Sequence, residues 1–135
     1  MNAELTGLKS KFRGADPRVP GFVERHFSTP LRVMFIGAHP DDPDVRCSGL
    51  ARTLVEAGHR VRFVALCNGD KGHQFMESPD LARRRFGESR RVIRTLGIED
   101  YVVGDTPDCE IEATLDARRW LTRVIREFGP HLIVT

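Results

Sequence analysis

The sequence predicts an α/β protein in which helices cover both faces of a mostly parallel sheet, forming a three-layer α/β/α sandwich. Short apolar runs of strand length alternate with longer stretches whose apolar residues recur at helical spacing. A strand followed by a helix occurs three times, and a fourth strand follows. This order is half of a doubly wound sheet. Because the sequence stops within that fourth strand, we expect the sheet to be incomplete on its C-terminal side.

The expected strands are residues 33–38, 61–67, 101–103 and 131–135. The first is a continuous uncharged apolar run, which is typical of a strand buried on both faces of a parallel sheet. The second is rich in β-branched and aromatic residues, and the last two are shorter runs of the same kind.

The expected helices are residues 45–57, 78–96 and 114–128, and each has a start or stop signal. Gly58 follows the first helix and suits the left-handed position after a helix end. The second begins with Ser78-Pro79-Asp80, which combines a capping hydroxyl, a proline and an acid in the first turn. A Gly-Pro pair ends the third helix.

Length and composition set the organisation of the chain. We expect an N-terminal extension over residues 1–30 and one domain over residues 31–135, because 135 residues suffice for a single modest core. A net charge of +2 indicates neither a nucleic-acid nor a membrane partner, and no apolar run is long enough to span a bilayer. Three cysteines without a CxxC pair, and the lack of a signal-peptide core, favour a cytoplasmic location.

The most informative segment is His39-Pro40-Asp41-Asp42, directly after the first strand. Ligands bind at the carboxyl ends of strands in open α/β sheets. One interpretation is a plain polar turn, since Pro and Asp are common turn residues. The other is half of a zinc site, in which His39 and Asp42 bind the metal. Neighbouring side chains in a turn point apart, so Asp41 would be free to act as a general base.

A family resemblance supports the second interpretation. Residues 38–42, followed by Cys47-Ser48-Gly49, resemble the AHPDDE…CGG signature of the PIG-L/LmbE family. That family consists of zinc-dependent N-deacetylases on a Rossmann-like fold. The resemblance implies that His39 and Asp42 are zinc ligands, that Asp41 is the general base, and that the substrate is an N-acetylated amino sugar or glycoconjugate. Pro43 replaces the family's usual glutamate.

Four further residues are candidates for substrate binding. Asp70 and His73 lie in the loop after the second strand, which we expect beside the first loop, although an ordinary polar role for His73 is favoured. Arg85 resembles the arginine of the family's RxxE segment. Asp108 resembles an aspartate in the family's segment after the third strand, and a turn role is equally compatible with its position.

The family's third zinc ligand comes from an HPDH motif, which this sequence lacks. We therefore expect weak metal binding and little activity from these 135 residues alone. Two other classes stay open: a Rossmann-like nucleotide-binding module, although GxGxxG is absent, and a non-catalytic remnant that binds a partner or sugar. An unfinished sheet edge would also permit a homo-oligomer.

Overall fold

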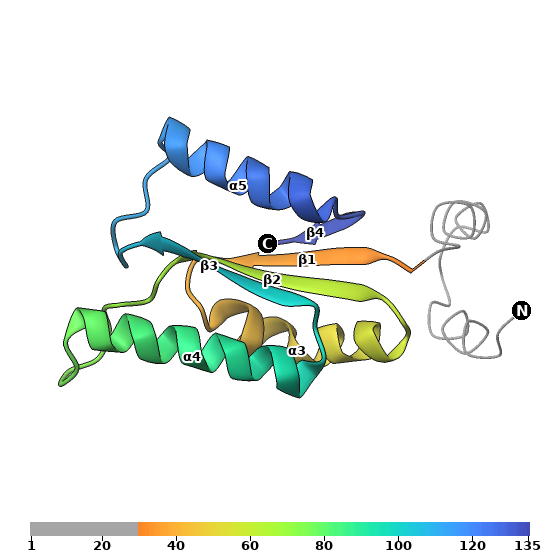
Figure 1. The fold of residues 1–135 in the computed structure, drawn as a ribbon, viewed down its shortest axis with the longest axis horizontal. Coiled ribbons are helices and arrows are strands. Elements are labelled where there is room, and N and C mark those ends of the chain that lie inside the picture. The colour runs from red at the N-terminus through yellow and green to blue at the C-terminus, as the bar shows by residue number, and fades with distance from the viewer. Residues whose placement is uncertain (1–29) are drawn as a thin grey trace, which may run out of the picture.

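The computed structural model describes residues 30–135, so the expected extension over residues 1–30 lies almost entirely outside the described residues. Three helices alternate with four strands (Figure 1). In chain order they are β1 (Arg32–Gly37), α3 (Asp42–Glu56), β2 (Arg60–Cys67), α4 (Ser78–Leu96), β3 (Asp100–Thr106), α5 (Leu115–Phe128) and β4 (Leu132–Val134).

The strands form one all-parallel sheet in the order β3-β2-β1-β4. Helices α3 and α4 cover one face and α5 covers the other, which confirms the three-layer α/β/α arrangement (Figure 1). Because every strand runs in the same direction, the loops that follow β1, β2 and β3 leave the sheet at one edge.

Successive apolar side chains along the central strands point to opposite faces of the sheet, so each face has its own hydrophobic core. On the α3/α4 face, Phe63 packs edge-to-face against both Phe35 and Tyr101, with ring centroids 5.5 Å apart in each pair. On the α5 face, Met34 and its neighbours pack against Val124 and Phe128. Residues 34 and 35 therefore face opposite layers, which explains why the first strand carries no charge between Val33 and Gly37.

Some element boundaries differ from the sequence-based expectation. Helix α3 begins at Asp42 rather than at residue 45, so Asp41 is its N-cap and Asp42 lies in its first turn. Helix α4 is preceded by Glu77 as N-cap, so the expected capping role of Ser78 is wrong. Strand β3 extends to Thr106 because Gly104 lets the strands approach closely: a Cβ there would lie 2.3 Å from the Leu66 carbonyl oxygen.

The helix ends follow the sequence more closely. Gly97 and Gly129 both adopt the left-handed conformation after α4 and α5, with φ of 71° and 59°. Thr114 caps α5 by accepting a hydrogen bond from the Ala117 N–H. Within the described part of the chain, no helix combines the length and the apolar character needed to cross a membrane.

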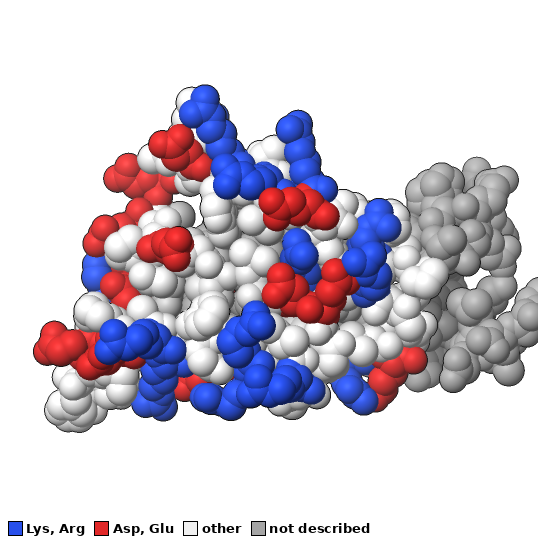
Figure 2. Space-filling view, viewed as in Figure 1, with Lys and Arg blue, Asp and Glu red and all other residues white. Residues whose placement is uncertain are grey.

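Charged side chains cover the outer helices. Figure 2 shows Lys and Arg gathered over α4 and α5, with Asp and Glu interspersed. On α4, Arg84 pairs with Glu88 at 2.9 Å, and Arg83 pairs with Asp80. Such exposed pairs one turn apart contribute at most a few tenths of a kcal/mol each, so packing rather than charge holds these helices to the sheet.

His59 gives the fold a pH dependence that can be tested. Its Nδ1 accepts a hydrogen bond from the Leu31 N–H at 3.1 Å, just before β1, and burial lowers the pKa of His59 below its usual 6.5. The unfolded chain therefore binds this proton more readily than the folded chain. We expect the contribution of His59 to the free energy of unfolding to be constant above pH 6.5 and to decline as the pH falls below it.

In His59→Asn, Oδ1 preserves an acceptor without titrating, so stability should fall less between pH 7 and pH 5 than in the wild type. Urea unfolding at several pH values measures the difference, and His73→Asn is the control because His73 is exposed. Equal slopes in the wild type and His59→Asn would show that His59 does not supply the effect.

Candidate functional site

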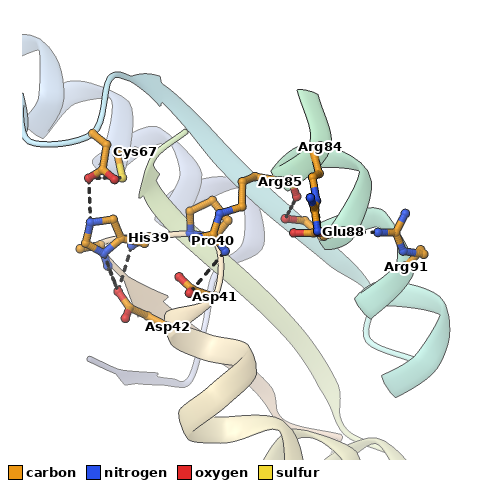
Figure 3. A network of polar contacts seen from close by, with 12 residues as sticks. His39, Pro40, Asp41, Asp42, Cys67, Arg84, Arg85, Glu88 and Arg91 are labelled. Atoms are coloured by element: carbon orange, nitrogen blue, oxygen red, sulfur yellow. Dashed lines mark hydrogen bonds and ion pairs between the residues drawn. The ribbon is translucent and has the colours of Figure 1, made fainter. Parts of the chain in front are cut away.

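Three loops meet at the carboxyl edge of the sheet and bring together side chains that are far apart in sequence. Residues 38–41 connect β1 to α3, residues 68–77 connect β2 to α4, and residues 107–114 connect β3 to α5. The Tyr101 hydroxyl donates a hydrogen bond to the Pro40 carbonyl, which ties the first loop to β3 beneath it. Figure 3 shows the result: the His39 ring lies between Asp42 and Cys67, with Asp41 to one side.

The Asp42 carboxylate is held by the backbone of its own loop. Its Oδ2 accepts hydrogen bonds from the Ala38 and His39 N–H groups, both at 2.9 Å. These bonds, led by the one from His39, lower the pKa of Asp42 and favour its ionised form. The Asp42 side chain can pack this close to β1 because residue 37 is glycine: a Cβ there would lie 2.5 Å from the Asp42 Cβ. The loop sequence therefore builds a fixed, charged oxygen beside His39.

His39 presents its two ring nitrogens to two different carboxylates. Its Nδ1 lies 3.4 Å from Asp42 Oδ2, and its Nε2 lies 2.8 Å from Asp108 Oδ1. The His39 and Asp42 side chains are 42% and 39% exposed, whereas the Asp108 side chain is 12% exposed. One side of the imidazole thus opens to solvent and the other is closed by a buried carboxylate.

Asp41 points away from this pair. Figure 3 shows it turned toward Arg85, whose Nη1 lies 3.3 Å from Asp41 Oδ2. Asp41 is 47% exposed, so it remains accessible beside the solvent-facing side of His39. The two adjacent carboxylates diverge as expected, because Asp41 pairs with Arg85 on α4 while Asp42 turns back to the Ala38 N–H.

Asp44 is a further carboxyl group close to Asp41 and was not among the predicted site residues. Burial raises the pKa of Asp44 to about 6, and the neighbouring Asp41 carboxylate adds to the increase. Its Oδ1 is buried without a hydrogen-bond partner among the described residues. It follows Pro43, which replaces the family's glutamate, so an acid is still present one residue later.

The four predicted substrate-binding residues lie at different places relative to His39 and Asp41. Asp70 and Asp108 are brought together, since the Asp108 N–H donates to Asp70 Oδ1 at 2.8 Å. Arg85 reaches the site through Asp41. His73 is exposed and lies outside the His39 cluster; its Nδ1 accepts a hydrogen bond from the Phe75 N–H.

A shallow hollow of about 180 Å³ lies on that outer side, lined by Gly72, His73, Leu81, Arg84, Arg85 and Glu88. His73 and Arg85 share it, so both border the approach to Asp41 from solvent. Substrate contact by any of the four residues stays a prediction.

Sequence reasoning missed Cys67. This residue is fully buried, and its Sγ lies 3.8 Å from Asp108 Oδ1. His39, Cys67 and Asp108 each offer one potential metal-ligand atom, all within 4.8 Å of one another. A useful signal was present, because Cys67 is the last residue of β2 and strand ends are where such sites form.

Comparison with known proteins identifies the family. Residues 34–135 match the PIG-L family, GlcNAc-PI de-N-acetylase. The chain belongs to this family of metal-dependent deacetylases. It is 28% identical to a diacetylchitobiose deacetylase of Thermococcus kodakarensis over 83% of this chain. It is 32% identical to the 1D-myo-inositol 2-acetamido-2-deoxy-alpha-D-glucopyranoside deacetylase of Thermobispora bispora over 77% of this chain.

Solved structures support the same fold. The N,N'-diacetylchitobiose deacetylase from Pyrococcus horikoshii superposes with a TM-score of 0.71 at 22% identity, over 90% of this chain and 51% of that one. GalB, the 4-carboxy-2-hydroxymuconate hydratase from Pseudomonas putida, superposes with a TM-score of 0.69 at 22% identity, over 76% and 45%. The fold is therefore shared by deacetylases and a hydratase, so the reaction must be argued from the site.

This chain spans about half the length of the relatives that it matches, 43% of both curated deacetylases. The donor set present in this PIG-L family chain suits a divalent metal. His39 Nδ1 and Asp42 Oδ2 are 3.4 Å apart, and bonds of about 2.0–2.2 Å from nitrogen and oxygen to zinc could meet between them. Both side chains are partly open to solvent, which leaves room for further ligands.

Gly69 fits the second loop against the first, and its replacement tests that packing. It has φ of 66°, and a Cβ there would lie 2.9 Å from Pro40 Cδ. We predict that Gly69→Ala lowers the free energy of unfolding by at least about 1–2 kcal/mol, the cost of the left-handed conformation for a residue with a Cβ. Denaturant unfolding measures this change.

Gly49→Ala is the matched control. Gly49 lies within α3, and a Cβ there meets nothing within 4 Å. The same substitution should raise stability there, by up to about 1 kcal/mol. If both variants were equally stable, close packing between the two loops would not be required.

Proposed function

We propose that the protein is a divalent-metal-dependent N-deacetylase that hydrolyses the N-acetyl amide of an amino sugar or glycoconjugate. One observation carries the proposal: His39 and Asp42 present converging donor atoms, with Asp41 accessible beside them, at the ligand-binding edge of a PIG-L family domain. The curated relatives are deacetylases of acetylated amino sugars by name, which indicates the substrate class.

We assign His39 and Asp42 as metal ligands, and zinc is the metal that we favour. Asp42 is already charged and fixed by two backbone N–H groups, so little reorganisation is needed for binding. When bound, a divalent metal supplies a Lewis acid that polarises the acyl oxygen and makes water more acidic. The His39 ring offers Nδ1 on the same side as the Asp42 carboxylate.

Asp41 is assigned as the general base. It accepts a proton of the attacking water as the carbon–oxygen bond forms, and it returns that proton to the amide nitrogen as the carbon–nitrogen bond breaks. The Arg85 guanidinium lies 3.3 Å from the Asp41 carboxylate and orients it. The acetyl group is released as acetate and the sugar retains a free amine.

Substrate recognition is assigned to the rim of this centre. Arg85 and His73 border the solvent-facing hollow and offer hydrogen-bond donors to sugar hydroxyl groups. Asp108 lies deeper, where it contacts His39, and its N–H donates a hydrogen bond to Asp70 Oδ1. A direct substrate contact is therefore better supported for Arg85 than for Asp108.

The cellular setting is part of the proposal. The three cysteines are free thiols, and we propose a cytoplasmic location on that basis. Self-association through β4 is also proposed, because within residues 30–135 β4 pairs only with β1, and Leu132 and Ile133 are 50% and 39% exposed.

Zinc titration of the 135-residue chain tests the ligand assignment. With two protein ligands we predict weak one-to-one binding. His39→Ala or Asp42→Asn should weaken the affinity at least about tenfold, because each removes one donor. His73→Ala, which alters an exposed histidine outside the pair, is the control and should bind zinc as the wild type does. Calorimetry measures all four proteins, and undiminished binding by His39→Ala would remove this site.

Replacement of the proposed base tests the reaction. In the complete natural polypeptide that contains these residues, Asp41→Asn should retain the metal but lose at least about 100-fold in turnover, the usual contribution of a general base. Release of acetate from an N-acetylglucosamine oligosaccharide is the assay, and metal content is measured on the same samples. Wild-type turnover in Asp41→Asn would exclude the base assignment.

A further inference from the structure

We propose that Asp108 is a positioning residue: it fixes the orientation and protonation of His39 so that Nδ1 is presented to the metal. This inference rests on the proposed function and deepens it. His39 Nε2 lies 2.8 Å from Asp108 Oδ1, a hydrogen-bond distance, although the two residues are 69 positions apart. Asp108 thus acts on the site through His39 rather than through the substrate.

The two ring nitrogens of His39 have separate tasks in this arrangement. An ionised carboxylate can only accept a hydrogen bond, so Asp108 requires the proton of a neutral imidazole to sit on Nε2. Nδ1 is then left with its lone pair, 3.4 Å from Asp42 Oδ2 and on the more exposed side of the ring. A metal-binding histidine usually donates its other N–H to a carboxylate or carbonyl, which orients the ring and increases its basicity.

Two backbone hydrogen bonds hold Asp108 in the position from which it contacts His39. Its Oδ1 also accepts a hydrogen bond from the Cys109 N–H at 3.0 Å, and its own N–H donates to Asp70 Oδ1 at 2.8 Å. Among residues 30–135, Cys109 is the one non-glycine residue with positive φ, at 65°. Such a conformation costs about 1–3 kcal/mol and persists where surrounding contacts enforce it. The backbone turns here so that the buried carboxylate faces His39.

A competing arrangement uses the same atoms differently. His39 Nε2, Cys67 Sγ and Asp108 could ligate a metal directly, since their donor atoms cluster within 4.8 Å. Three observations favour positioning instead. Nε2 and Oδ1 are at hydrogen-bond distance, Cys67 is fully buried away from solvent, and Asp42 would be left outside the site on the other side of the ring. Substitution of Cys67 separates the two arrangements.

The experiment compares the metal affinity of the 135-residue chain with that of four variants. Asp108→Ala removes the acceptor, and Asp108→Asn retains an amide oxygen without the charge. Asp105→Asn makes the same charge change at an exposed position near the end of β3, and Cys67→Ser removes the thiol. Zinc affinity is measured by competition with a chromogenic chelator, and cobalt(II) spectra report any thiolate ligand. Melting temperatures show that each variant is folded.

We expect Asp108→Ala to lose 10- to 100-fold in zinc affinity, the range typical of such partners. Asp108→Asn should lose less, because its amide oxygen still accepts the Nε2 proton. Asp105→Asn and Cys67→Ser should bind as the wild type does, without a thiolate band in the cobalt spectrum. Unchanged affinity in Asp108→Ala would overturn the inference, as would a thiolate band that Cys67→Ser abolishes.

A second measurement without metal separates this inference from the proposed function. Nitrogen-15 NMR of the His39 ring should show Nε2 protonated, with its proton protected from solvent exchange, and Asp108→Ala should remove that protection. If the wild type bound no metal, the proposed function would fail, yet a protected Nε2–H would still show that Asp108 orients His39. An unprotected, averaging ring in the wild type would overturn the inference whatever the metal result.

Discussion

The site depends on the hydrogen bonds that the Asp42 carboxylate accepts from the backbone of the loop just before it. Two N–H groups, from Ala38 and His39, converge on one oxygen at the point where β1 becomes α3. Those N–H groups lie beyond the last strand pairing of β1, and the side chain supplies the acceptor that they need. The same contact therefore provides an acceptor for both N–H groups at the junction of β1 and α3. It also leaves a charged oxygen beside His39.

Around that contact the fold adds support from both neighbouring loops. Tyr101 reaches from β3 to the Pro40 carbonyl, and Gly69 packs against the Pro40 ring. The Tyr101 ring is also part of the edge-to-face stack with Phe63 in the core. The hydrophobic core below the loop therefore restricts the positions of the His39 and Asp41 side chains, in addition to their polar contacts with Asp108 and Arg85.

The carboxylates near His39 have distinct environments, and these give them distinct roles. Asp42 is held by backbone N–H groups, Asp41 faces Arg85 and solvent, and Asp108 is buried against the imidazole. Burial raises the pKa of Asp44 to about 6, which sets it apart from Asp42, whose pKa is lowered. Asp42, Asp41 and Asp108 each have a separate hydrogen-bond or ion-pair partner, whereas burial favours the neutral form of the Asp44 carboxyl group. These carboxylates therefore have separate partners and do not form one shared acidic patch.

The sequence alone predicted the secondary-structure elements and the placement of the loop after β1, because both depend on residues close together in the chain. Periodicity predicted each helix and strand found within residues 30–135. The order of His39, Asp41 and Asp42 after an apolar run predicted where they would lie, because strand ends and helix starts are local events. The exact ends of α3 and β3 were not predicted, since they depend on Asp42 turning back and on Gly104 approaching β2. The contact of Asp108 with His39, the burial of Cys67 beside both, and the exclusion of His73 from that cluster required the folded chain. They follow from the parallel register of β1, β2 and β3 and from loop conformation, which no short stretch of sequence contains.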